Sequence, residues 1–321
     1  MISQLKKRRQ HGLSWRSIVV VSAGFAVFTL FFIFGFRNHD SSNRVNVVVA
    51  TSPVTVWSWN TNDNTFIVLS IPSDDVIDAL YGYGNYSLEA LWRLGFIDKK
   101  SGLLLSDSLS DTLGLPITSY IGTKSQELLN VSDPLMYGRQ LFSLSNVFSF
   151  MSAGYQSNMP MGLFVAFSRA LGAARPDKIQ SIDIGNLGAV SEESLPDGTI
   201  RNILSPDFLD HTLGNVFEND AFRAEDLSVA LYNTTDVPAV GNRAARLLTN
   251  AGILVVTVGN DQKPLNRCEL IGSATPLSSK TAAYIISVFN CKKIVSQESA
   301  RADLIVRLGN DFAKRFETSK N

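Results

Sequence analysis

Two segments of this chain contain residue types that carry out chemistry in other proteins, but their spacing favours structural roles. Ser205, Asp207 and His211 are the three side-chain types of a hydrolytic triad. They are better explained as the start of a helix, because Ser205 precedes a proline and an acidic residue follows in the first turn. The glycines of 82–87 have part of a dinucleotide-binding pattern, but no strand directly precedes them and no acidic ribose ligand follows about 20 residues later. Neither segment indicates an enzyme.

The two cysteines, Cys268 and Cys291, are both in the C-terminal part of the chain. Cys268 falls in a predicted strand and Cys291 just after a predicted helix, as neighbours across a βαβ-like unit would. In an oxidising compartment we favour a disulfide between them over two separately buried thiols. A zinc site is not expected, because none of the three histidines stands at ligand spacing to a cysteine.

Residues 17–36 form an apolar run without a single charge. A helix of this length rises about 30 Å, the thickness of the hydrocarbon core of a bilayer. Basic residues between Lys6 and Arg16 precede the run, which places the N-terminus in the cytoplasm and the rest of the chain outside. The run is longer than that of a signal peptide, and no small-x-small cleavage site follows Phe36. We therefore expect a single-pass, uncleaved membrane anchor.

Composition gives no indication of a nucleic-acid partner, and we expect none. The chain has 321 residues, with 29 Lys and Arg against 29 Asp and Glu, so its formal net charge is zero. No helix-turn-helix or basic reading helix is evident, so a DNA-binding regulator is not expected. The length suffices for two domains and an anchor.

The part that follows the anchor predicts a mixed sheet with flanking helices. The predicted elements are strands at 45–50, 54–59 and 66–71 and helices at 87–94 and 104–113. An asparagine-rich turn at 60–64 supplies a hairpin between the last two strands. Gly114 stands where the second helix would end.

From 134 to 172 the pattern is helical and strongly apolar. Leu144, Val147, Phe148 and Met151 fall on one face of a helix. The simpler interpretation is a helix packed on the sheet. The alternative is that Leu144, Phe148 and Met151 line a groove for a lipid tail.

The C-terminal part predicts a small βαββαβ unit, a mixed sheet with two helices on one face. The elements are strands at 227–231, 253–258, 267–272 and 303–308 and helices at 239–250 and 278–290. The turn 233–236, Gly252 after the first helix and the closing ADLIVRLGNDF (302–312) resemble the C-terminal domain of the LytR family. This resemblance covers 226–316 and implies a place at the bacterial cell envelope.

Three short segments resemble a second envelope family. SIPSDD (70–75), YGYG (81–84) and LGLPI (113–117) occur in the order of motifs in the LytR-CpsA-Psr (LCP) phosphotransferase domain. The resemblance covers about 45–121. It implies transfer of a glycopolymer from polyprenyl pyrophosphate to peptidoglycan, with arginines against the pyrophosphate and aspartates for a magnesium ion.

Two groups that this resemblance implies are missing. Ser73 stands where the family has an arginine, and 50–59 holds no aspartate where the family binds magnesium. Asp74 stands at the position of the aspartate in the family motif. Asp74 and Arg93 are therefore the candidate catalytic residues. Asp75 stands where the family usually has a threonine. Further candidate replacements for the arginine are Arg139, Arg169 and Arg175. We expect a degenerate domain without metal or cofactor, and magnesium only if the chain is a transferase.

The expected fold class is α/β (α+β). The expected parts are a basic tail (1–16), a transmembrane helix (17–36), a tether (37–43), a degenerate LCP-like domain (44–222), a LytR C-terminal domain (223–316) and a tail (317–321). We expect an extracytoplasmic envelope protein that binds or organises cell-wall polymer without catalysis. The alternative is an active LCP-type phosphotransferase. Expected partners are the membrane and a cell-wall glycopolymer or polyprenyl lipid.

The topology can be tested directly. We expect protease added outside spheroplasts to remove a C-terminal epitope, because everything after residue 36 lies outside the membrane. An epitope that stays protected until the membrane is lysed would show the opposite orientation.

Overall fold

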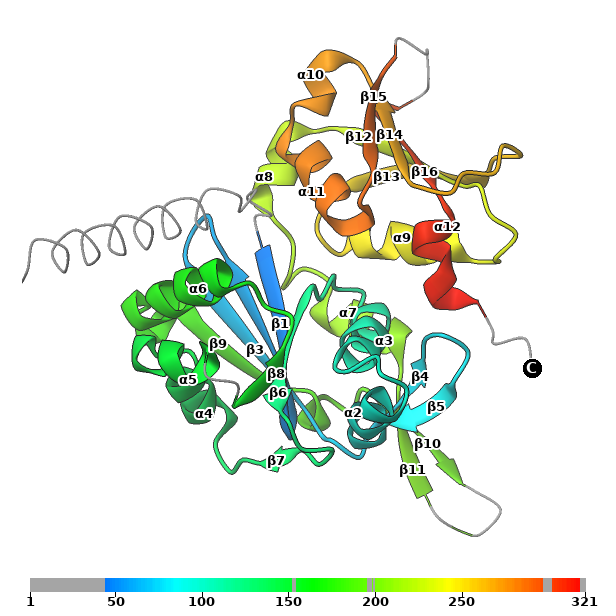
Figure 1. Cartoon of the computed structure of the whole chain (residues 1–321). Helices are drawn as coiled ribbons and strands as arrows, with labels where there is room; N and C mark the ends of the chain where they lie inside the picture. Colours follow the sequence, from blue (N-terminus) through cyan, green and yellow to red (C-terminus); the bar gives the residue numbers. More distant parts are fainter. Residues whose placement is uncertain (1–43, 152–153, 195–197, 199, 297–301, 318–321) are drawn as a thin grey trace, which may run out of the picture.

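The computed structural model describes residues 44–151, 154–194, 198, 200–296 and 302–317 (Figure 1). The predicted transmembrane helix and tether lie outside these residues. Among the helices that the structure does describe, none combines the length and the apolar character needed to cross a bilayer.

The N-terminal part of the described chain, which we call the N-terminal domain, is built on a seven-stranded mixed sheet with the order β8-β6-β1-β2-β3-β9, and β7 also pairs with β1. The strands are β1 (Arg44–Ser52), β2 (Val54–Asn60), β3 (Thr65–Ile71), β6 (Ser119–Thr123), β7 (Leu129–Asn130), β8 (Tyr155–Ser157) and β9 (Ile179–Asp183). β2 is antiparallel to β1 and β3, whereas β6 is parallel to β1 and β9 to β3. The carboxyl ends of β1, β3, β6 and β9 therefore share one edge of the sheet, and their amino ends share the other.

Helices cover both faces of this sheet, which explains the continuous apolar runs of β1 and β3. The helices of this part are α2 (Leu88–Ile97), α3 (Leu103–Leu113), α4 (Pro134–Leu141), η1 (Leu144–Asn146), α5 (Val147–Met151), α6 (Met161–Ala173), η2 (Pro176–Lys178), η3 (Gly185–Leu187) and α7 (Pro206–Leu213). Val48 and Leu69 pack towards α2, α3 and α7 in one cluster. Trp57 and Phe66 pack towards α4 and α6 in the other.

The predicted helical stretch at 134–172 is divided in the structure into α4, η1, α5, β8 and α6. The prediction of helix is confirmed for most of this stretch, including 144–151, but not for the strand β8, which pairs with β6. Ser143 caps η1, and Asn158 accepts from the Tyr120 amide at 2.8 Å beside the strand pair β6–β8. Pro160 then precedes α6.

A four-stranded sheet with the order β10-β11-β4-β5 is absent from the sequence prediction. Its strands are β4 (Val76–Ala79), β5 (Gly84–Ser87), β10 (Val190–Ser194) and β11 (Ile200–Leu204). They are short, and β5 and β10 are largely exposed and polar, so they lack an apolar alternation.

The C-terminal part of the described chain, which we call the C-terminal domain, begins with α8 (Asp220–Glu225), whose Phe222 lies in its core. It holds a five-stranded mixed sheet with the order β13-β12-β16-β14-β15. Its elements are β12 (Ser228–Asn233), α9 (Val240–Thr249), β13 (Leu254–Asn260), β14 (Glu269–Gly272), α10 (Ala274–Leu277), α11 (Lys280–Phe289), β15 (Lys292–Val295), β16 (Leu304–Leu308), α12 (Asn310–Ala313) and η4 (Lys314–Phe316). The predicted order is correct except for β15, an exposed edge strand that begins with two lysines.

Both long helices of this domain contribute to one core. Leu231 and Val306, on adjacent strands, share a cluster with Leu247 of α9 and Ile285 of α11. Alternate strand residues point to one face of a sheet, so both helices cover that face, as predicted.

α9 and the end of the chain hold the two domains together (Figure 1). Arg246 donates from Nη2 to the carbonyl oxygen of Thr112 at 2.8 Å and from Nη1 to that of Asp111, at the carboxyl end of α3. The same guanidinium pairs with Asp210 of α7 at 2.5 Å. The last carbonyls of a helix have no partner within it, so Arg246 caps α3 from the other domain.

Cys268 and Cys291 are joined by a disulfide, the pairing that the sequence favours. They directly precede β14 and β15, and the Lys292 amide donates to the carbonyl oxygen of Cys268 at 2.8 Å. The bridge therefore attaches the edge strand β15 to the sheet.

Labelling of the unreduced, denatured full chain should find no free thiol. Reduction should lower the free energy of unfolding by about 2–4 kcal/mol, because it releases a loop in the unfolded chain. Two labelled cysteines without reduction would contradict the bridge.

Replacing Arg246 with Ala should lower the free energy of unfolding by about 1–3 kcal/mol, since it removes the ion pair with Asp210 and the hydrogen bonds to two carbonyl oxygens of α3. Urea unfolding followed by circular dichroism measures this. Arg93→Ala is the matched control, because Arg93 forms only an exposed pair within α2 and its loss should cost less than about 0.5 kcal/mol. Equal losses for the two variants would contradict the bridging role of Arg246.

Candidate functional site

The carboxylates that the sequence points to lie after the carboxyl end of β3. Asp74 is exposed, whereas Asp75 is 1% exposed. β3 pairs with β9 so that Ser70 stands opposite Asp183, which brings a third carboxylate to this edge. The Asp75 carboxyl accepts a hydrogen bond from the Asn202 side chain, and its Oδ2 is buried without a hydrogen-bond partner.

Burial, with the neighbouring charges of Asp74 and Asp183, raises the pKa of Asp75 to about 6, although the Asn202 hydrogen bond acts in the opposite direction. Burial and the two neighbouring carboxylates disfavour the ionised form. Asp75 therefore titrates near neutral pH rather than carrying a constant charge.

The arginines proposed as replacements are not gathered at these carboxylates. Ser73, at the motif position of the missing arginine, has its Oγ 2.8 Å from the Oγ of Ser52. Arg93 pairs with Glu89 on the same helix at 3.1 Å, with about half of its side chain exposed. Arg175 pairs with Asp177 at 3.0 Å. In the described part of the chain, no arginine forms an ion pair with Asp74 or Asp75.

The three aspartates at this edge do not form a metal site. Across the described ranges, no group of three or more His, Cys, Asp or Glu side chains is arranged to hold a metal ion. The carboxylates present at this edge therefore do not fit a magnesium site.

The predicted lipid groove coincides in part with a hollow of about 620 Å³ between α4 and α6. Leu144 and Phe142 line it, together with Arg139 and Arg169. The side chains of Phe148 and Met151 lie outside what the structure describes. The groove of Leu144, Phe148 and Met151 therefore stays a prediction.

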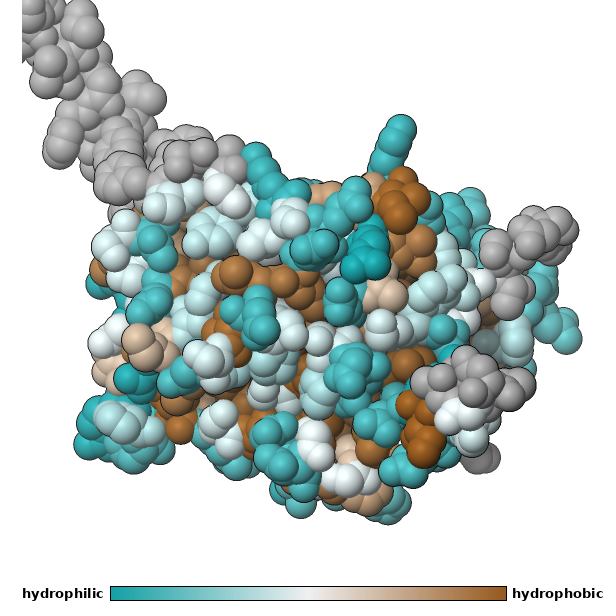
Figure 2. Space-filling model, turned by 90° about the horizontal axis from the view of Figure 1, so that it is seen from below, coloured by the Kyte–Doolittle hydropathy of each residue, from teal (hydrophilic) through white to brown (hydrophobic). Residues whose placement is uncertain are grey.

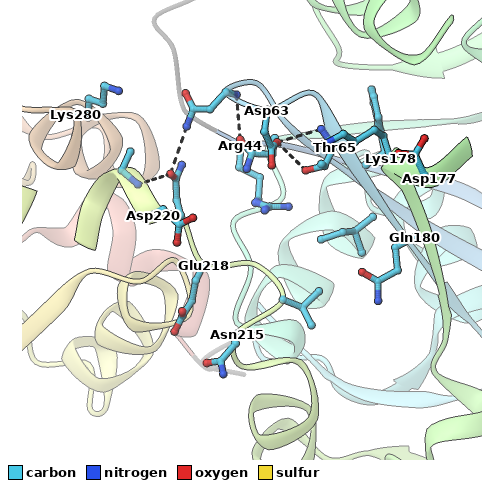
Figure 3. A pocket seen from close by; sticks show the side chains of 17 residues that line it. Arg44, Asp63, Thr65, Asp177, Lys178, Gln180, Asn215, Glu218, Asp220 and Lys280 are labelled. Carbon is cyan, nitrogen blue, oxygen red and sulfur yellow. Dashed lines mark hydrogen bonds between the residues drawn. The ribbon is translucent and has the colours of Figure 1, made fainter. Parts of the chain in front are cut away.

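A larger cleft of about 640 Å³ lies between the two domains, at the amino ends of β1, β3 and β9 (Figure 3). The N-terminal domain supplies the start of β1, the turn between β2 and β3, the start of β9 and the segment that leads to α8. The C-terminal domain contributes Lys280, at the start of α11. The cleft is at the opposite edge of the sheet from Asp74 and Asp75.

Arg44 is the most buried charged residue of this cleft, with only 9% of its surface exposed. Its Nη1 donates to the Oγ of Ser58 at 3.0 Å and its guanidinium stands 5.6 Å from the ring centre of Phe217. Its Nε is buried without a hydrogen-bond partner. Burial lowers the pKa of Arg44, partly offset by the charge of Asp63. Figure 3 shows the guanidinium pointing into the open space of the cleft.

Sequence reasoning missed this cleft. Its lining comes from segments far apart in the chain, so no contiguous motif marks it. The available signals were Arg44, a charge at the start of an apolar strand, and the asparagines of 60–64, which were interpreted only as a turn.

Figure 2 shows the molecule of Figure 1 from below. On this face, hydrophobic residues form several small patches between hydrophilic ones. Among the residues coloured in that view, no single large apolar patch marks a docking surface.

Residues 226–312 match the family model described as LytR cell envelope-related transcriptional attenuator. The prediction that the chain carries a LytR C-terminal domain is therefore confirmed. A comparison with curated proteins finds no match.

Solved structures similar to this chain include the transcriptional regulator yvhJ from Bacillus subtilis, with 15% identity, coverage of 53% of this chain and 94% of that chain, and a TM-score of 0.38. Lin1025 from Listeria innocua is 12% identical over 54% of this chain and 96% of that chain, with a TM-score of 0.38. The B. subtilis LytR-CPS2A-psr family protein YwtF (TagT), with bound octaprenyl pyrophosphate lipid, is 12% identical over 53% and 87%, with a TM-score of 0.35.

The pKa of Asp75 predicts a pH dependence of stability. Its value of about 6 in the folded chain exceeds the value of about 3.9 expected after unfolding, so the folded state holds the proton more tightly. The contribution of this carboxyl to the free energy of unfolding is fully present below about pH 4. It is lost as the pH rises through 6. Asparagine at this position does not titrate, so Asp75→Asn should not lose this contribution. Relative to wild type, the free energy of unfolding of the variant should rise by about 1–3 kcal/mol between pH 4 and pH 7.5.

Unfolding of both proteins in urea at several pH values measures the difference, in which the other titrating groups cancel. A difference that stays constant from pH 4 to 7.5 would contradict the raised pKa.

Proposed function

We propose that this chain, whose residues 226–312 form a LytR C-terminal domain, is a membrane-anchored, extracytoplasmic envelope protein that binds cell-wall polymer without transferring it. The anchor and the orientation come from the apolar run at 17–36 and the basic residues before it. The envelope role is supported by the match of the C-terminal domain.

The observation that supports a function without catalysis is that no arginine in the described part of the chain forms an ion pair with Asp74 or Asp75. Departure of a pyrophosphate-linked group develops negative charge, which a transferase must offset with cations placed at that point. Here the motif position holds Ser73, whose hydroxyl is engaged with Ser52, and Arg93 is paired with Glu89. Asp75 itself is a buried acid with an unpartnered oxygen, which disfavours any further negative charge beside it.

The second candidate function is an active LCP-type phosphotransferase that uses magnesium. One observation favours it: Arg139 and Arg169 both line the hollow that contains Leu144, so two arginines and an apolar surface occur together. An arginine pair could bind a pyrophosphate head group next to a lipid tail.

Two assays on the full chain in detergent separate these functions. Co-sedimentation with purified cell-wall sacculi tests binding, and incubation with a polyprenyl pyrophosphate-linked glycan and an acceptor glycan tests transfer, with and without magnesium. We expect the chain to sediment with the sacculi and to transfer nothing.

Asp74→Ala is the informative variant, and Asp207→Ala, at an exposed site of α7, is its matched control. Transfer that disappears with Asp74→Ala and survives Asp207→Ala would establish the phosphotransferase. Failure to sediment with sacculi would reject the binding function.

A further inference from the structure

We propose that the cleft between the two domains binds a neutral saccharide segment that carries hydroxyl and amide groups, such as an N-acetylated cell-wall glycan. This inference rests on the proposed function and names the site at which the polymer is held. The cleft is distinct from the carboxylates of the LCP-like motif, because it lies at the opposite edge of the sheet.

Two buried donors face no acceptor within the described residues. The Nε of Arg44 and the Nδ2 of Asn219 are both buried without a hydrogen-bond partner, and their residues are only 9% and 4% exposed. Asn219 already uses its Oδ1 to accept from the Ala221 amide at 2.9 Å and from the Asn62 side chain at 3.4 Å. Leaving a buried donor unsatisfied is unfavourable, so a ligand that brings acceptor oxygens into this cleft would gain two hydrogen bonds.

The charged groups that line the cleft have both signs. The cleft contains three cationic side chains, Arg44, Lys178 and Lys280, and four carboxylates, Asp63, Asp177, Glu218 and Asp220. Two of these carboxylates are paired with arginines, so the lining offers both donors and acceptors rather than a uniformly cationic surface for a phosphate group. A sugar hydroxyl accepts from a guanidinium or amide and also donates to a carboxylate, so a saccharide can satisfy both kinds of group.

Several carboxylates are already held in place, which leaves the cleft preorganised. Asp63 accepts from the Thr65 amide at 3.1 Å and from its hydroxyl at 2.8 Å. Asp177 pairs with Arg175 and Glu218 with Arg223. Side chains fixed before binding lose less conformational entropy when a ligand arrives.

Amide side chains complete the chemistry of the lining. The cleft contains Asn60, Asn62, Gln180, Asn215 and Asn219. Amides both donate and accept, which suits the acetamido groups of an amino sugar. The volume of about 640 Å³ falls within the range of roughly 300–1,000 Å³ that is typical of small-ligand sites. Figure 3 shows Gln180 on one side of the space and Glu218 and Asp220 on the other.

The test is isothermal titration calorimetry of the full chain in detergent with the β-1,4-linked tetramer of N-acetylglucosamine, and in parallel with inorganic pyrophosphate. We expect the saccharide to bind and the pyrophosphate to bind more weakly. Arg44→Gln should weaken saccharide binding roughly tenfold or more, because it removes a charged donor from a buried site.

Exposed positions keep the test independent of folding. Gln180→Ala and Asn215→Ala alter the cleft at exposed residues and should each weaken saccharide binding a few-fold. Gln126→Ala makes the same substitution at an exposed residue near the opposite edge of the sheet and should leave binding unchanged.

Each outcome bears on one of the two proposals. Saccharide binding that is unaffected by all three cleft variants, or tighter binding of pyrophosphate that is lost in Arg44→Gln, would overturn this inference. If the full chain also sediments with sacculi and the cleft variants sediment equally well, the binding function stands and only the assignment of the cleft fails. Absence of saccharide binding would likewise overturn the inference.

Discussion

The capping of α3 by Arg246 is the interaction on which the arrangement of the two domains depends. The guanidinium binds the carbonyl oxygens of Asp111 and Thr112 and the carboxylate of Asp210, so one side chain of α9 contacts two helices of the N-terminal domain. Gly114 makes this approach possible. It ends α3 with a φ of +59°, and a Cβ at this position would stand 2.3 Å from the Nδ2 of Asn250. A cleft lined by both domains requires this fixed contact.

The sequence predicts the elements whose burial follows a clear pattern. β1 and β3 are apolar throughout because both faces of their sheet are covered, and α9 and α11 have capping residues or glycines near their ends. The sheet formed by β4, β5, β10 and β11 could not be predicted, because strands such as VSEES in β10 depend on pairing with a neighbour rather than on their own apolar residues. The apolar stretch at 134–172 was interpreted as helical because periodicity does not register a strand that pairs with the distant β6.

The two candidate sites differ in the same way. Asp74 and Asp75 were found because they are contiguous with a strand and fit a motif. The Asn202 partner of Asp75 was not predictable, since Asn202 lies on β11, more than a hundred residues later. The burial that raises the pKa of Asp75 likewise appears only in the folded chain. The cleft was missed altogether because Arg44, Gln180, Asn219 and Lys280 meet only in the folded chain. The mixture of cationic, anionic and amide side chains in the cleft belongs to that assembly and to no single segment.

The central claim is that the chain holds cell-wall glycan in the cleft between its domains and performs no chemistry at Asp74 and Asp75. Hydrogen–deuterium exchange of the full chain, with and without soluble cell-wall glycan, tests this most directly. The account predicts slower exchange at 60–67 and 215–221, which line the cleft, and unchanged exchange at 72–89. Protection confined to 72–89, with the cleft unchanged, would contradict it.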